Sequence, residues 1–235
     1  MEVPDLSFGA DYWKYRYNMG YIDWQLKDVY FMLIEHYQKM NPNGKAKRVF
    51  YPMCGMSLDM NWLVDQGVSV IGVEITSQAL EMFVSRSEQQ WTKFPFPKLG
   101  TSAELFMRKD DKMKLYCADI QEFSSHIEGK FDAMYDRGSI QYVEPERVSS
   151  YAQVLKDLLH TGGRLLLEVV EYDPKLLEDK TLNLPVKVPP PYSMTTEDVK
   201  RLFEPECSVE RVKTHTCNRF LGKNADFHVH LVIKM

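Results

Sequence analysis

The stretch from Arg48 to Glu74 constrains the fold more than any other part of the sequence. Its first apolar run, Val49–Tyr51, predicts a strand, and Gly55 follows where the chain must turn. A short helical pattern comes next, and a second apolar run, Val68–Val73, closes on the acid Glu74. The order strand, glycine turn, helix, strand and acid, with the acid about twenty residues beyond the glycine, is typical of a nucleotide-binding βαβ unit.

This unit favours a cofactor that contains adenosine but no phosphates. The turn at Gly55 allows the backbone to approach a ligand, and the carboxylate of Glu74 can accept hydrogen bonds from both ribose hydroxyls. Gly55 is the only glycine where a dinucleotide site would have G-x-G-x-x-G, so little bare backbone is available for a pyrophosphate. The unit therefore points to S-adenosyl-L-methionine. The alternative is an ordinary βαβ unit in which Glu74 is a solvated strand end.

Length and charge narrow the classes of protein further. The 235 residues suit one α/β domain, residues 1–235, and the net charge of −4 disfavours nucleic acid and acidic membranes as partners. No apolar run approaches the ~20 residues needed to span a bilayer, and the N-terminus lacks a signal-peptide pattern. The four cysteines have no C-x-x-C spacing, which favours reduced thiols over disulfides or zinc. We expect a cytoplasmic monomer that acts on a small molecule and uses no metal.

Residues 11–40 are rich in aromatic side chains and predict a cap over the sheet. Apolar residues recur at helical spacing from Trp24 to about Gln38, which predicts a helix there. Before it, Trp13 and Trp24 flank Gly20 in a short segment without regular periodicity. One interpretation is a hydrophobic lid over the core. The other is a mobile flap whose aromatic rings cover a flat ligand.

Strands and helices alternate along most of the remaining chain. Residues 91–112 interrupt this alternation and predict an insertion, with a small hairpin around Glu104–Arg108. The alternation itself predicts a doubly wound, mostly parallel sheet with helices on both faces. Strands are predicted at 113–117, 131–135 and 164–170, and helices at 77–84, 145–160 and after Thr195.

The last two predicted strands have no helix between them. Residues 208–216 and 227–234 should therefore pair antiparallel. In the second of these strands His228 and His230 alternate with apolar residues, and we expect both histidines to face outward. The predicted fold class is α/β, with a seven-stranded, mostly parallel, doubly wound (Rossmann-like) sheet, an antiparallel C-terminal strand and an N-terminal helical cap.

Candidate site residues follow the carboxyl ends of successive predicted strands, where ligands bind in doubly wound sheets. Besides Gly55 and Glu74 these are Asp119 and Arg137. Asp119 either accepts a hydrogen bond from an adenine amine or simply caps a helix. Arg137 either contacts a carboxylate of the cofactor or the substrate, or it pairs with the neighbouring Asp136.

Several stretches of the sequence resemble the thiopurine S-methyltransferase family. They are VFYPMCG, WLVDQGVSVIGVEI, LYCAD, FDAMYDRGSI, PPPYSMTTEDVKRLF and the W-x10-W-Q of the N-terminal segment. The resemblance implies a class I methyltransferase fold and methyl transfer from S-adenosyl-L-methionine to the sulfur of aromatic or heterocyclic thiols such as thiopurines, with S-adenosyl-L-homocysteine as product. It implies that Trp24 faces the substrate. It also implies these cofactor contacts: Trp13, Met53, Gly55, Glu74, Asp119, Ile120 and Arg137.

Methyl transfer from a sulfonium to a thiolate needs alignment and exclusion of water more than a strong base. A free thiol has a pKa near ~8.5, so some thiolate is present at neutral pH. We expect Arg137, together with Arg219 from the loop between the last two strands, to favour the anion. Asp23, beside Trp24, either relays a proton or is solvated.

Other functions are weighed against this one. A different soft nucleophile, such as sulfide, selenide or a small aliphatic thiol, fits the same machinery. A non-catalytic protein that binds the cofactor fits the fold, although the combination of Glu74, Asp119 and Arg137 argues against it. A dinucleotide oxidoreductase is disfavoured by the lone Gly55 and by the antiparallel end of the chain.

Overall fold

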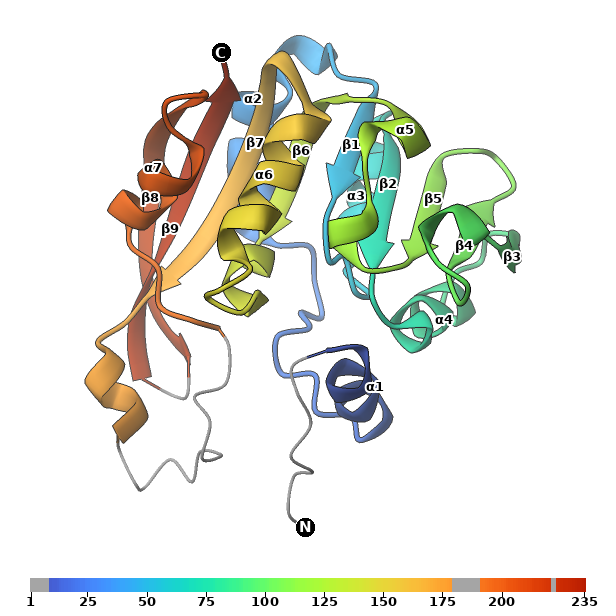
Figure 1. Cartoon of the computed structure of the whole chain (residues 1–235), viewed down its shortest axis with the longest axis horizontal. Coiled ribbons are helices and arrows are strands. Elements are labelled where there is room, and N and C mark those ends of the chain that lie inside the picture. The colour runs from blue at the N-terminus through green and yellow to red at the C-terminus, as the bar shows by residue number, and fades with distance from the viewer. Residues whose placement is uncertain (1–8, 179–190, 221–222) are drawn as a thin grey trace.

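The computed structural model describes residues 9–178, 191–220 and 223–235. In these residues one mixed sheet of nine strands runs through the molecule in the order β3-β4-β5-β2-β1-β6-β7-β9-β8 (Figure 1). The strands are β1 (Arg48–Tyr51), β2 (Ser69–Glu74), β3 (Trp91–Pro95), β4 (Glu104–Arg108), β5 (Met113–Cys117), β6 (Phe131–Arg137), β7 (Leu159–Glu171), β8 (Cys207–Phe220) and β9 (Lys223–Lys234).

The five central strands of the sheet are parallel. β1 pairs with β2 and β6, β2 pairs with β5, and β6 pairs with β7, all in the same direction. These strands are apolar without alternation, as at residues 165–170 of β7, because both faces of the sheet are covered. The strand order reverses at β1. The carboxyl ends of β1, β2, β5 and β6 therefore meet at the edge of the sheet where such folds bind ligands.

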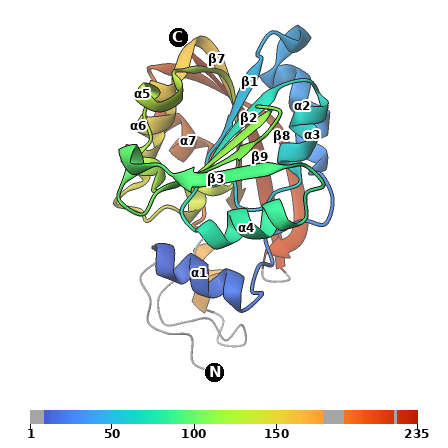
Figure 2. The ribbon, with the colours of Figure 1, turned by 90° about the vertical axis from the view of Figure 1, so that its right-hand side faces the viewer.

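The helices form two layers and a cap. α2, α3 and α4 pack on one face of the sheet, and α5, α6 and α7 pack on the other (Figure 2). α1 lies outside both layers, beside α4 at the carboxyl-end edge (Figure 1). No helix among the described residues has the length and apolar character to cross a membrane. The helices are α1 (Ala10–Asn18), α2 (Phe31–Met40), α3 (Asp59–Asp65), α4 (Ser77–Ser85), α5 (Ser125–Glu128), α6 (Val148–Leu158) and α7 (Thr196–Phe203).

The expected seven-stranded sheet is extended by a hairpin. β3 pairs antiparallel with β4, and β4 pairs antiparallel with β5. The insertion at residues 91–112 thus adds two strands at one edge of the sheet. It does so because β4 buries Leu105 and Phe106 and completes the hydrogen bonding of β5.

The predicted helix from Trp24 to Gln38 is wrong at its start. The chain forms α1 where we expected an irregular segment, and α2 begins only at Phe31. The backbone N–H of Tyr30 donates to Oδ1 of Asp59 at 2.8 Å, so the last residue before α2 is attached to the first residue of α3. A tertiary contact, rather than periodicity, decides where this helix begins.

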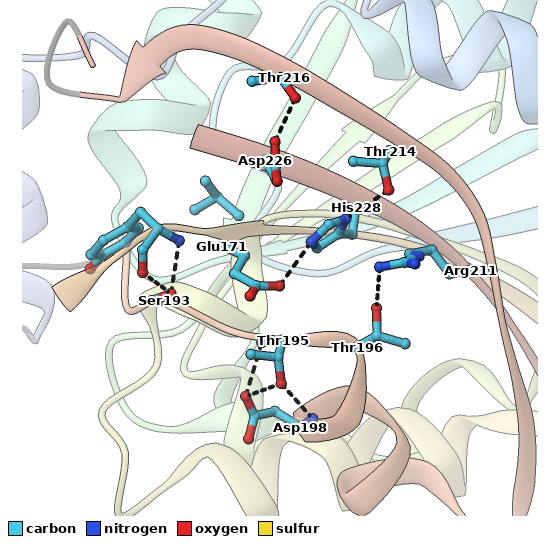
Figure 3. A network of polar contacts seen from close by, with 12 residues as sticks. Glu171, Ser193, Thr195, Thr196, Asp198, Arg211, Thr214, Thr216, Asp226 and His228 are labelled. Carbon is cyan, nitrogen blue, oxygen red and sulfur yellow. Dashed lines mark hydrogen bonds and ion pairs between the residues drawn. The ribbon is translucent and has the colours of Figure 1, made fainter. Parts of the chain in front are cut away.

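The C-terminal strands pair antiparallel as expected, with β9 between β7 and β8. The prediction that His228 and His230 face outward is wrong, because both side chains are buried. The segment around Thr196 lies over this face of the sheet (Figure 3). Nε2 of His228 lies 2.9 Å from Oε2 of Glu171, and Nε2 of His230 lies 3.0 Å from the hydroxyl oxygen of Thr196. The polar histidines are therefore satisfied in part by partners distant in the sequence.

Candidate active site

A cleft lies at the carboxyl ends of the central strands, where the strand order places it. Ligand pockets commonly enclose ~300–1,000 Å³, so α1 must move before this cleft can take a molecule of cofactor size. The cleft has a volume of about 60 Å³ and is lined by Trp13, Met53, Val73, Glu74, Ile75, Ala118, Asp119, Ile120, Gln121, Tyr142, Val143, Glu144 and Arg147.

Glu74 is the buried carboxylate of this cleft. Its Oε2 accepts a hydrogen bond from the backbone N–H of Gly55 at 3.0 Å, and its Oε1 accepts one from the N–H of Thr76 at 3.0 Å. Burial raises the pKa of Glu74 to about 7, although these backbone N–H groups lower it. Each carboxylate oxygen has a second lone pair, so the side chain can still accept hydrogen bonds from a ligand. Glu74 is therefore not the solvated strand end that we kept as an alternative.

Gly55 is required by the turn itself. Its φ is +53°, in the left-handed region that favours glycine, and a Cβ there would lie 2.7 Å from the hydroxyl oxygen of Tyr17. Tyr17 is a buried residue of α1, and burial followed by the charge of Glu74 raises the pKa of its hydroxyl. α1 thus inserts a tyrosine hydroxyl beside the glycine turn, a contact that the sequence did not reveal.

Asp119 both caps a helical turn and lines the cleft. Its Oδ1 accepts a hydrogen bond from the N–H of Gln121 at 2.9 Å, and its Oδ2 lies 3.0 Å from Nη2 of Arg147. Ile120 follows it as a buried residue at the wall of the cleft. Met53, at the end of β1, is a lining residue with a φ of +44°. The cap that we considered for Asp119 is present, and an adenine contact stays a prediction.

Arg137 does not pair with Asp136, which was one of the two expectations. Asp136 points to the opposite face of the sheet, where it accepts hydrogen bonds from the Ser139 N–H and the Tyr151 hydroxyl, both at 2.7 Å. Burial raises the pKa of Asp136 to about 6. Nε of Arg137 instead lies 3.8 Å from Oδ2 of Asp59, in a side chain that is 13% exposed.

Aromatic rings from α1 and its connection to α2 cover the cleft. The ring of Trp13 lies edge-on to Trp24 at 5.4 Å and to Tyr142 at 5.5 Å between centroids. Trp24 also meets Tyr17 at 5.9 Å, and its carbonyl oxygen accepts a hydrogen bond from Nη2 of Arg137 at 3.4 Å. The structure therefore brings Trp13, Trp24 and Arg137 together, as the family resemblance implied. Gly20 has a φ of +69° at the end of α1, so the proposed hinge has the backbone freedom of glycine.

Two expected residues do not join this arrangement. The side chain of Asp23 is 95% exposed and lies 3.8 Å from Nη2 of Arg16, so its position does not support a proton relay. Arg219 belongs to β8, and not to a loop as we expected, and its side chain lies outside the described part of the structure. Cys54 is buried behind the turn, and burial raises the pKa of its thiol, which fits a packing residue.

A larger hollow of about 690 Å³ lies apart from the predicted site, at the ends of β7 and β9. The network in Figure 3 borders it. None of the predicted cofactor residues lines it, so its size alone does not make it the active site. Its lining is Glu171, Tyr172, Asp173, Pro174, Ser193, Thr195, Thr216, Asn224, Ala225 and Asp226.

Sequence reasoning missed Tyr17, Tyr30, Tyr142 and Glu168. A signal for Glu168 was present, because it is an acid inside the otherwise apolar run LLLEVV of a buried strand, where an unpaired charge is costly. Tyr17 stands four residues after Trp13, which places both on one face of a helix, once α1 is known to be helical.

The fold is shared with solved methyltransferases. The crystal structure of 1,6-didemethyltoxoflavin-N1-methyltransferase from Burkholderia thailandensis matches with a TM-score of 0.63 at 14% identity, over 100% of this chain and 94% of that chain. Magnesium protoporphyrin IX methyltransferase from Synechocystis PCC 6803 matches with a TM-score of 0.61 at 14% identity, over 93% and 96% of the two chains. The architecture is that of the class I S-adenosylmethionine-dependent methyltransferases.

Sequence comparison narrows this class to one family. The model of the thiopurine S-methyltransferase family matches residues 8–230. The probable thiopurine S-methyltransferase of Danio rerio is 28% identical over 212 residues, which are 90% of this chain and 85% of that protein. The thiopurine S-methyltransferase of Bos taurus is 32% identical over 166 residues, which are 71% of this chain and 63% of that protein. The chain belongs to the thiopurine S-methyltransferase family, and the resemblance seen in the sequence is confirmed.

Proposed function

We propose that this protein transfers the methyl group of S-adenosyl-L-methionine to the sulfur of aromatic or heterocyclic thiols, thiopurines among them. Family membership over residues 8–230 supports the activity. The structural observation that carries the proposal is the buried carboxylate of Glu74, which faces the Gly55 turn at the end of β2. An adenosyl cofactor needs such an acceptor for its ribose, and no polyphosphate cradle is required.

The residues of the cleft fit the proposed cofactor. Glu74 would accept hydrogen bonds from the ribose hydroxyls, and the apolar side chain of Ile120 together with Asp119 would border the adenine. Arg137 would attract the carboxylate of the methionine part. The cofactor, when bound, supplies an electrophilic methyl group on a sulfonium. α1 would have to rise from the cleft to admit it, with Gly20 as the point where the backbone turns.

The chain's own contribution to the reaction is alignment, exclusion of water and charge. Trp13, Trp24 and Tyr142 would form an aromatic wall that holds a flat acceptor, because ring contacts add ~0.5–1.5 kcal/mol beyond area burial. The same wall keeps water from the reacting atoms. The guanidinium of Arg137 would favour the thiolate form of the acceptor. These residues need no strong base, since a thiol ionises in part at neutral pH.

The proposal is tested by a binding step followed by a turnover step. S-adenosyl-L-homocysteine, but not NAD, should bind and should protect peptide bonds within residues 10–24 from a protease. With methyl-labelled cofactor, aromatic thiols should then take up label faster than small aliphatic thiols or sulfide. Binding with no labelled product from any acceptor would favour the non-catalytic alternative. A preference for sulfide or aliphatic thiols would favour the other soft nucleophiles.

The affinity for S-adenosyl-L-homocysteine should fall as the pH is lowered through about 7. The pKa of Glu74 is raised by burial to about 7. Above this pH the side chain is a carboxylate that accepts from both ribose hydroxyls, and below it the protonated form has lost part of that capacity. A ligand that prefers the charged form lowers the pKa, so affinity changes by at most about tenfold per pH unit. Calorimetry between pH 5.5 and 8.5 measures this, and Glu74→Gln should flatten the profile. An equally steep profile in Glu74→Gln would assign the dependence to another group.

A further inference from the structure

A buried cluster of charged groups lies where the acceptor would meet the sheet, and it consists of Arg137, Asp59, Glu168 and Tyr30. Arg137 and Glu168 are neighbours across β6 and β7. The hydroxyl of Tyr30 donates to Oε2 of Glu168, while the backbone N–H of Tyr30 donates to Asp59. The guanidinium carbon of Arg137 lies 5.5 Å from the centre of the Tyr30 ring. One tyrosine therefore touches all three charged residues.

The charges of this cluster do not balance. It holds one guanidinium and two carboxylates, and the residues Asp59 and Glu168 are only 2% and 6% exposed. Burial alone lowers the pKa of Arg137, but the surrounding hydroxyls and both carboxylates raise it, so the guanidinium stays charged. Buried charges are screened far less than charges at the surface. A molecule bound beside Arg137 would therefore feel the second carboxylate as well as the cation.

Two donors of this region are not used by the described protein. Nε of Arg137 and the hydroxyl of Tyr135 have no hydrogen-bond partner among the described residues. Tyr135 is 2% exposed and stands on β6 two residues before Arg137, on the same face of the sheet. Both donors can bond to an acceptor molecule, so the cluster is placed to contact one.

We propose that Glu168 determines the charge preference of the acceptor site. A lone Arg137 would favour acceptors that carry an extra negative charge. The carboxylate of Glu168, added to that of Asp59, cancels this preference, and the site then favours aromatic thiols that have no anionic substituent. This inference rests on the proposed function, because it takes the acceptor to bind beside Arg137.

The competing explanation is that Glu168 only anchors the connection between α1 and α2. Two variants separate these roles. Glu168→Gln keeps the size of the side chain and an oxygen that accepts from Tyr30, but it removes the charge. Tyr30→Phe removes the hydrogen bond and keeps the charge of Glu168. A purely structural anchor would be weakened in both variants, without any dependence on the charge of the ligand.

The test compares two thiols that differ in one charge, 4-mercaptobenzoate and 4-methylbenzenethiol. Their dissociation constants are measured in the presence of S-adenosyl-L-homocysteine, and their methylation rates with the active cofactor. Glu168→Gln should improve binding of 4-mercaptobenzoate relative to 4-methylbenzenethiol by about tenfold, as expected for unit charges roughly 10 Å apart at an effective dielectric constant of about 20. Tyr30→Phe should leave this ratio at the wild-type value.

The outcomes are distinct. An unchanged binding ratio in Glu168→Gln overturns the role of Glu168, and so does an equal change in both variants. Failure of either thiol to bind to any form also overturns it, because the site then takes no such acceptor. If both thiols bind and neither is methylated, the proposed function fails, while the binding ratio still decides the role of Glu168.

Discussion

Replacing Arg137 with lysine should lower turnover of an aromatic thiol by about 10²-fold and leave the affinity for S-adenosyl-L-homocysteine much less changed. Lysine keeps a positive charge beside Asp59 but loses the planar set of donors that the guanidinium offers to an anion. The loss of one preorganised donor to a developing or reacting anion commonly costs 10²–10³-fold in rate. Steady-state rates with a fixed saturating cofactor concentration measure the effect.

The choice of lysine follows from the burial of Arg137. Arg137→Ala would leave Asp59 without its cation, and breaking a buried ion pair in this way costs about 3–5 kcal/mol of stability. Arg48→Lys is a matched control, because Arg48 pairs with Glu128 at the start of β1, away from the carboxyl-end edge. Normal turnover in Arg137→Lys, or an equal loss in Arg48→Lys, would remove Arg137 from the reaction.

Glu74→Ala should weaken binding of S-adenosyl-L-homocysteine by about 1.5–3 kcal/mol, the range for hydrogen bonds to a charged group. The side chain is buried, so water does not replace it easily as an acceptor. It also fixes the turn through the Gly55 N–H, and its loss therefore removes both a ligand contact and part of the preorganisation of the turn. Isothermal calorimetry at pH 8, where the wild-type side chain is ionised, gives the difference directly.

Asp136→Asn provides the matched control for this measurement. Asp136 is also a buried acid at a strand end, but it bonds to Tyr151 and the Ser139 N–H on the face opposite Glu74. Its substitution should lower the thermal midpoint and leave the affinity of the folded protein unchanged. If the two variants weaken binding equally, the loss reflects general disturbance of the sheet edge, and Glu74 has no specific role in holding the ribose.

The position of the cleft could be predicted because it depends on local sequence and on a general rule of topology. The run from Arg48 to Glu74 contains both strands and the turn between them, and parallel neighbours bring their carboxyl ends together. Thr195 could be predicted as a helix cap for a similar reason, and it forms a capping box with Asp198 within four residues of chain. Such features need no information from distant residues.

The surroundings of the site could not be predicted in this way. Tyr30 meets Asp59 and Glu168, which are 29 and 138 positions further along the chain. The periodic pattern after Trp24 continued into α2, but it contained nothing to show that the Tyr30 N–H would bond to Asp59 and that the helix would start there. The histidines of β9 alternated as outward residues do, and only the packing of the segment at Thr196 buries them.

The sequence by itself determined the α/β class, the parallel core, the Gly55 turn with Glu74 and the family. Each of these follows from short-range periodicity or from a motif whose residues lie close together in the chain. Tertiary structure alone decided that Arg137 lies beside Asp59 and not Asp136, that Asp23 stays at the surface, and that Glu168 joins the acceptor side of the site. The physical reason is that a charged group's partner is set by which strand faces and helix ends meet in space. The sequence order of the residues carries no signal for that meeting.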